Sequence, residues 1–219
     1  MPAQALQPLE IGAAARTLAG EKESGDRFVV LPSRHGTVVS VVDGLGHGPA
    51  AAFAGKLAVH AISKHVDDIL PVQVERCHQM LKKSRGAVMA LAHLQPTAGQ
   101  MSWLSIGNVA ALRLRPTSRG QASVHSVLPR GGIIGHRVPA RMQTLSETLD
   151  FQVGDLVLFA TDGIAEVFYR DVDCQAPCQA IADSLLKRHS KETDDALVLV
   201  LRWNENPPTD PSASGPGQP

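Results

Sequence analysis

The residues in this chain that could do chemistry are aspartates at the ends of apolar segments. Asp43 follows a β-branched apolar run and precedes a glycine-rich turn at residues 44–48. Asp162 follows a second apolar run, and Asp194 and Asp195 precede a third. A carboxylate that closes a buried strand needs a charged partner, because burying an unpaired charge is costly. Oxygen ligands of this kind suit hard divalent cations such as magnesium and manganese. The pattern predicts one metal site assembled by the fold.

Each of these positions also has an ordinary structural interpretation. Asp43 before glycine is typical of a turn cap, Asp162 of a helix N-cap, and the pair Asp194-Asp195 of a β-turn. Three acidic positions at predicted strand ends, taken together, favour the metal site over three unrelated turns. The carbonyl oxygen of Gly44 is a further candidate ligand, because no side chain crowds it.

Asp26 and His47 lie close to these motifs in sequence. Asp26 follows a glycine and opens a predicted strand, so by itself it is typical of a loop residue. His47 is either a loop histidine that hydrogen-bonds to the backbone or a proton donor. None of the nine histidines has the spacing of a zinc site, so none is predicted to bind metal.

The overall composition limits the class of protein. The 219 residues suffice for one domain with a substantial core, and Lys+Arg and Asp+Glu balance at 21 each. This balance argues against nucleic acid and anionic membranes as partners. No apolar run is long enough for a membrane span, and the N-terminus lacks an export signal, which predicts a cytoplasmic protein. The three cysteines are too few for a disulfide framework and are interpreted as inert thiols rather than a metal or redox pair.

Hydrophobic periodicity predicts an α+β domain over residues 1–203, followed by a disordered tail rich in Pro, Ser and Gly at residues 204–219. The preferred architecture has two stacked antiparallel sheets flanked by pairs of helices. The helices are expected at residues 49–66, 71–84, 163–169 and 176–188. The strands are expected at residues 9–18, 26–32, 36–43, 87–94, 101–106, 110–114, 122–128, 142–149, 156–161 and 196–203.

The acidic motifs resemble, in order, those of the metal-dependent serine/threonine phosphatases of type 2C. The run Asp-Gly-Leu-Gly-His-Gly at residues 43–48 is most similar to the SpoIIE-like bacterial branch, and in particular to its short stressosome phosphatases. Residues 107–108 and 131–135 also resemble the middle motifs of that branch. By itself the latter segment is interpreted as a tight turn, because it lacks the Lys-Ser/Thr of a nucleotide-binding loop.

The resemblance implies two manganese or magnesium ions at one end of the sandwich. Asp43 would bridge both ions, the Gly44 carbonyl and Asp26 would serve one, and Asp162 and Asp194 the other. Asp194 aligns with the family ligand, and Asp195, which directly follows it, is the second candidate of that pair. Through the bound ions, Asp43, Asp162 and Asp194 would support attack of an activated water on phosphorus.

The chain also departs from the family pattern. Leu45 stands where the eukaryotic branch has a histidine proposed as general acid, so His47 does not inherit that role by alignment. The family's phosphate-binding arginine has no clear match, and Arg16 and Arg27 are only candidates.

The resulting prediction is a monomeric enzyme that hydrolyses phosphoserine or phosphothreonine on stressosome proteins with STAS domains. The first alternative is a phosphoprotein-binding module of the same fold without turnover. The second is a phosphatase that acts on a free anti-anti-sigma factor, and a nucleotide-binding enzyme is a distant third.

Overall fold

The computed structural model describes residues 9–117, 122–139 and 146–204. These residues form two five-stranded sheets, in the orders β1-β10-β9-β6-β7 and β2-β3-β4-β5-β8. All named strand pairs are antiparallel. The strands are β1 (Leu9–Arg16), β2 (Arg27–Ser33), β3 (Gly36–Gly44), β4 (Ala87–Gln95), β5 (Gln100–Ile106), β6 (Ala110–Pro116), β7 (Ala122–Ser126), β8 (Glu147–Asp150), β9 (Leu156–Ala160) and β10 (Ala196–Trp203).

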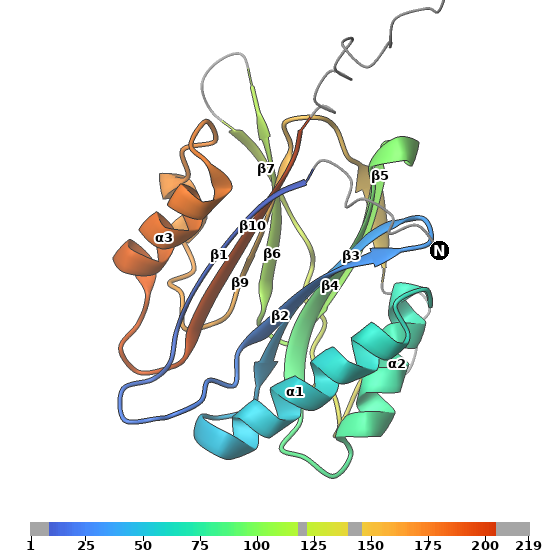
Figure 1. Cartoon of the computed structure of the whole chain (residues 1–219), viewed down its shortest axis with the longest axis vertical. Helices are drawn as coiled ribbons and strands as arrows, with labels where there is room; N and C mark the ends of the chain where they lie inside the picture. Colours follow the sequence, from blue (N-terminus) through green and yellow to red (C-terminus); the bar gives the residue numbers. More distant parts are fainter. Residues whose placement is uncertain (1–8, 118–121, 140–145, 205–219) are drawn as a thin grey trace, which may run out of the picture.

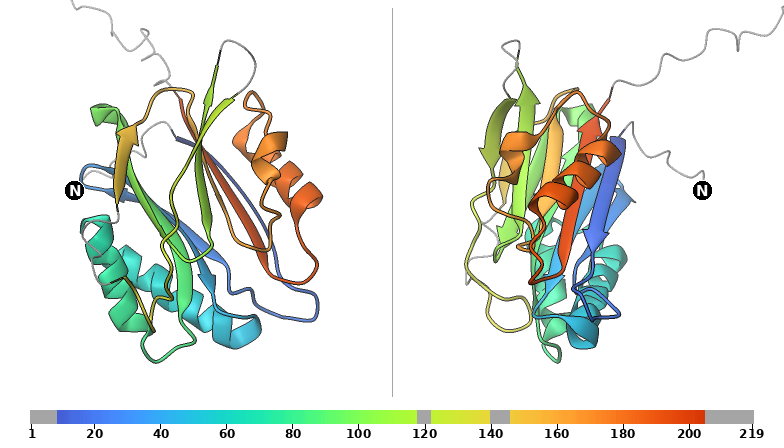
Figure 2. Two further views of the ribbon diagram at one scale, coloured as in Figure 1. Left: turned by 180° about the vertical axis from the view of Figure 1, so that it is seen from behind. Right: turned by 90° about the vertical axis from the view of Figure 1, so that its left-hand side faces the viewer.

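Helices cover the outer faces of the two sheets (Figures 1 and 2). The helices α1 (Gly48–Lys64) and α2 (Leu70–Leu81) pack together against the sheet that contains β3 and β4. The helix α3 (Cys178–His189) packs against β1 and β10 of the other sheet. The layers therefore follow the predicted order of helix, sheet, sheet and helix, and the predicted fold class is confirmed. None of the helices in the described parts of the chain has the length and apolar character needed to cross a bilayer.

The core has three apolar layers because the central strands are buried on both faces. In β3, Val39 and Val41 face the opposite sheet, whereas Val38 and Val42 face the two helices. In β10, the leucines face the opposite sheet and the intervening valines face α3. A strand that is covered on both faces has a continuous apolar sequence, and for this reason the predicted bounds of these strands lie close to the observed ones.

The second predicted helix pair is incomplete. We expected a helix at residues 163–169, but the structure has turns there and one 3-10 turn, η3 (Phe168–Asp171). The reason is backbone pairing with the segment that precedes β10. Ala165 donates to the carbonyl of His189, and Lys191 donates to the carbonyl of Gly163, so these groups are not available to a helix.

The predicted meander between residues 87 and 149 is divided between the sheets. The hairpin β4-β5 lies in one sheet and the hairpin β6-β7 in the other, and β8 returns to pair with β5. Two predicted segments lie partly outside the described residues. They are residues 142–145 of the strand predicted at 142–149 and residues 205–219 of the predicted disordered tail. The second 3-10 turn, η1 (Pro96–Ala98), connects β4 to β5.

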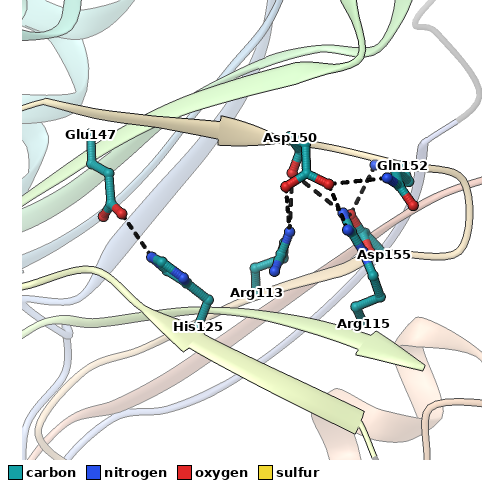
Figure 3. A network of polar contacts seen from close by, with 7 residues as sticks. All are labelled: Arg113, Arg115, His125, Glu147, Asp150, Gln152 and Asp155. Carbon is teal, nitrogen blue, oxygen red and sulfur yellow. Dashed lines mark hydrogen bonds and ion pairs between the residues drawn. The ribbon is translucent and has the colours of Figure 1, made fainter. Parts of the chain in front are cut away.

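A polar network joins the two sheets away from the acidic strand ends (Figure 3). Arg115 on β6 binds both carboxylate oxygens of Asp155 at 2.7 Å and also pairs with Asp150 on β8. Arg113 pairs with Asp150 at 3.1 Å. Asp155 is only 1% exposed, so its charge depends on the guanidinium of Arg115. The network thus couples β6, an inner strand of one sheet, to β8, the edge strand of the other.

We expect Arg115→Ala to lower the free energy of unfolding by about 3 kcal/mol, because it leaves the buried Asp155 carboxylate without its cation. Urea unfolding measures the change. The matched control is Arg188→Ala, which breaks a surface pair with Asp171 and should cost less than about 1 kcal/mol. Equal losses in the two variants would contradict a structural role for the network.

Candidate metal centre

Three of the predicted ligands meet at one end of the sandwich. Asp43 is the penultimate residue of β3, Asp162 follows β9, and Asp194 precedes β10. The ends of strands from both sheets therefore come together here (Figure 1). All three side chains line one pocket of about 390 Å³. Residues far apart in sequence therefore share one acidic opening. The other lining residues are Leu45, Gly46, Val88, Gly107, Asn108, Gly131 and Ile133.

Asp26 lies behind this opening and is held by a short hydrogen-bond chain. Its carboxylate accepts from the hydroxyl of Thr161 at 2.7 Å, and that hydroxyl accepts from the backbone N–H of Leu197 at 2.9 Å. Asp26 is 4% exposed. This chain of hydrogen bonds fixes one carboxylate oxygen of Asp26.

Asp195 is engaged by the backbone of the loop between β1 and β2. Its two carboxylate oxygens accept from the N–H groups of Leu18 at 2.8 Å and Gly25 at 2.7 Å. The side chain is buried, so these charge-assisted bonds are not shared with water. The neighbouring Asp194 points a carboxylate into the pocket instead.

Burial, together with the closeness of the carboxylates to one another, raises the pKa values of three acids at the site. Burial raises the pKa of Asp43 to about 8, and the charges of Asp26 and Asp162 add to the effect. Burial likewise raises the pKa of Asp26 to about 7, against the hydrogen bond from Thr161. The pKa of Asp194 is also raised, mainly by burial. A site that disfavours its own negative charges in this way is suited to a cation.

Two polar residues that we did not assign to the site hold Asp162. Asn108 donates its amide N–H to the Asp162 carboxylate at 2.7 Å, and the ammonium of Lys191 donates to the Asp162 carbonyl at 2.7 Å. Asn108 follows a glycine between two strands, and the signals in the sequence were this placement and the resemblance of residues 107–108 to a family motif. Lys191 carried no signal in the sequence, because its position depends on the loop before β10.

The glycines after Asp43 and Asp162 are required by close packing. A Cβ on Gly44 would lie 2.2 Å from the carbonyl oxygen of Ala51, and a Cβ on Gly163 would lie 1.8 Å from that of Asp195. Any side chain at these positions would push the strand end away from its neighbour. Both Asp-Gly pairs therefore owe their glycine to the approach of another backbone segment.

His47 lies at the rim, paired with an acid that the sequence did not single out. Its Nδ1 lies 2.6 Å from the carboxylate of Glu21, which comes from the loop between β1 and β2. Glu21 also packs against Gly48, where a Cβ would lie 2.5 Å from a carboxylate oxygen. The positive φ of 71° at Gly48 and its missing side chain make room for this acid.

The two candidate arginines do not line the pocket. Arg16 donates to the backbone carbonyls of Lys191 and Asp194, which holds the loop before β10. Arg27 donates to the carbonyl of Asp26 at 2.8 Å. Both guanidinium groups therefore serve the backbone that carries the acids.

The residues around the pocket fit a magnesium-type cation. The lining carboxylates of Asp43, Asp162 and Asp194 are hard oxygen donors. The pKa values of Asp43, Asp194 and the nearby Asp26 are raised. As placed, no three His, Cys, Asp or Glu side chains among the described residues form a closed ligand cluster. Such a cluster is not required, because magnesium is bound through one or two carboxylates and retains several waters.

Comparison with known proteins agrees with this geometry. The family model described as "Stage II sporulation protein E (SpoIIE)" matches residues 33–204. Phosphoserine phosphatase RsbX from Bacillus subtilis (strain 168) is 24% identical over 182 residues, which cover 83% of this chain and 88% of RsbX.

Two solved structures share the fold. One comes from work on "the bacterial stressosome: a modular system that has been adapted to control secondary messenger signaling". It is 28% identical with a TM-score of 0.78, and the match covers 89% of this chain and 99% of the other. The second is RsbX in complex with magnesium, which is 20% identical with a TM-score of 0.76 and covers 89% of this chain and 94% of the other.

Two stacked antiparallel sheets with an acidic pocket at one end define the fold of the PP2C-type protein phosphatases, a class of hydrolases. The chain belongs to the SpoIIE family. The resemblance inferred from the motifs is thereby confirmed.

We expect Asp195→Ala to lower the free energy of unfolding by about 3 kcal/mol, because the buried N–H of Gly25 and the partly buried N–H of Leu18 lose their acceptor. Hydrogen exchange at Leu18 and Gly25 should accelerate with it. The control is Asp194→Asn, which keeps an oxygen for the N–H of Asp195 and should change stability by less than about 1 kcal/mol. If Asp195→Ala left the two amides protected, the loop-holding role would be wrong.

Proposed function

We propose that this protein hydrolyses phosphoserine or phosphothreonine on a protein substrate and that it depends on divalent cations. The observation that carries the proposal is the meeting of Asp43, Asp162 and Asp194 in one pocket. Membership of the SpoIIE family and the relationship to a phosphoserine phosphatase support it.

The ligands that we propose come from both sheets. Asp43, Asp26, Asp162 and Asp194, together with the carbonyl oxygen of Gly44, would hold two magnesium or manganese ions. RsbX has been solved with magnesium, which supports this choice of metal. Divalent cations in such a site lower the pKa of water and offset charge on phosphoryl oxygens. Because both carboxylate oxygens of Asp195 bind backbone N–H groups, we assign that residue to positioning the loop of Asp26.

Neighbouring side chains would orient the proposed ligands. Asn108 and Lys191 keep Asp162 in one orientation, and Thr161 does so for Asp26. No cysteine lines the pocket, and Cys77 is buried with a pKa raised by burial to about 12, which supports hydrolysis without a thiol nucleophile.

The pair of Glu21 and His47 suits a proton donor at the rim. The Glu21 carboxylate holds Nδ1, so the other ring nitrogen remains for the oxygen that leaves phosphorus. The alternative is that the pair only holds the glycine-rich loop, which is the role of a loop histidine.

The substrate that we propose is a phosphorylated STAS-domain protein of a stressosome, met by this protein as a monomer. The relationship to RsbX and the structural match from work on the bacterial stressosome support this choice. A free anti-anti-sigma factor is the alternative substrate, and dephosphorylation assays on both would separate them. The absence of a membrane-spanning helix in the described residues is consistent with the proposed cytoplasmic location.

We expect Asp43→Asn and Asp162→Asn to lower kcat/KM by about 10³-fold, or about 4 kcal/mol of transition-state stabilisation. Phosphate release from a phosphoserine protein with manganese present measures this loss. Manganese should also raise the Tm of the native protein but not of Asp43→Asn, since only a binding-competent fold is stabilised. The control is Asp183→Asn, an exposed acid on α3 that should keep full activity.

The non-catalytic alternative makes a different prediction for the same experiment. A binding module would show the manganese-dependent rise in Tm without any phosphate release. Release of phosphate that is unaffected by Asp43→Asn would reject the proposed site but not the phosphatase activity.

We expect His47→Gln to lower kcat on a phosphoserine peptide by about 100-fold if the residue donates a proton. Its effect on p-nitrophenyl phosphate should be much smaller, because the nitrophenolate leaves without protonation. Glu21→Gln should show the same contrast in weaker form. Equal losses on the two substrates would assign His47 to holding the loop.

A further inference from the structure

A group of basic side chains lies in loops that adjoin the acidic pocket. They lie in two loops, residues 82–86 between α2 and β4 and residues 128–138 after β7, and neither loop contains an acidic residue. All of these side chains are exposed. We call them the basic rim, which consists of Lys82, Lys83, Arg85, Arg130, His136 and Arg137.

The two loops are packed into one surface. Ala87 and Ile134 exchange backbone hydrogen bonds of 3.0 and 2.8 Å, and His136 donates from Nε2 to the carbonyl of Arg85 at 3.0 Å. A Cβ on Gly86 would lie 2.7 Å from His136. These contacts fix the backbones of the two loops relative to each other, so the basic residues project from one continuous surface. Figures 1 and 2 show the turn from α2 to β4 at the end of the sandwich where α1 begins.

The basic rim adjoins the pocket directly. A Cβ on Gly46 would lie 2.9 Å from Nη1 of Arg85, and Gly46 lines the acidic pocket. On the other side, Gly131 lines both this pocket and a neighbouring cavity of about 470 Å³, which Arg137 also lines. A polypeptide whose phosphorylated side chain entered the pocket would therefore lie across these cations.

The charges of the rim are available to a partner. Within the described ranges, none of the six residues forms an ion pair. Elsewhere on the surface, basic residues such as Lys56 and Arg188 pair with acids of the same chain. Unpaired charges of one sign beside a cleft attract the opposite charge and raise its rate of encounter.

We propose that the basic rim is the docking surface for the protein substrate and selects phosphorylated sites flanked by acidic residues. This inference rests on the proposed phosphatase function and adds the chemistry of its partner. The cations contact the flanking acids of the substrate, and the acidic pocket with its ions receives the phosphoryl group.

The test uses three phosphoserine peptides of equal length, flanked by Glu and Asp, by Ala, or by Lys. We expect kcat/KM to be at least about tenfold higher for the acidic peptide than for the lysine peptide, and this ratio should fall as salt increases. In Lys82→Glu with Lys83→Glu the ratio should fall by about tenfold or invert.

The matched control is Lys64→Glu with Lys187→Glu. It changes the net charge equally at the last turns of α1 and α3, outside the rim, and should keep the native ratio. Circular dichroism melts verify that both double variants fold.

Each outcome separates the two proposals. If the native protein released phosphate equally from all three peptides, the docking inference would be wrong and the phosphatase function would stand. No release from any peptide or phosphoprotein would reject the function itself. Salt-sensitive inhibition by duplex DNA without any peptide preference would assign the rim to nucleic acid and overturn the inference.

Discussion

The constraint on which this structure depends is the close approach of like charges. Strand ends from both sheets bring carboxylates into one pocket, where burial and mutual repulsion raise the pKa of Asp43 to about 8. Desolvated negative charges are tolerated only with a compensating partner. The fold therefore holds the acids in an arrangement that favours cation binding, and its hydrophobic layers supply the free energy that keeps them there.

The polar contacts behind the pocket separate the acids that we propose as ion ligands from an acid that organises the chain. Thr161 fixes Asp26, and Asn108 fixes Asp162, so these carboxylates keep an oxygen in one orientation. Asp195 instead binds two N–H groups of the loop that carries Asp26 and Glu21. Supporting contacts of this kind orient ligands and tune their charge. At the other end, Arg115 pairs with Asp155, next to β9 of its own sheet, and with Asp150 on β8 of the opposite sheet, and neither contact is part of the pocket.

A net charge of zero conceals an uneven distribution. Acids gather inside the pocket, and unpaired cations gather on the loops beside it. The overall balance, which argued against nucleic acid, does not describe this local field. The proposed phosphoprotein substrate presents two kinds of anion, which are the phosphoryl group and acidic side chains. In our proposal the ions held by the pocket would receive the first, and the basic rim would contact the second.

The sequence by itself determined most of the element types and the candidate ligands. Apolar runs such as those before Asp43 and Asp162 locate strands buried on both faces, and glycine after each acid signals a close approach. Tertiary structure alone decided the rest, because it depends on which backbone groups meet. Residues 163–165 pair with the chain before β10 instead of forming a helix, and the meander divides between two sheets. The different environments of Asp194 and Asp195 follow from where Leu18 and Gly25 lie, which no local pattern encodes.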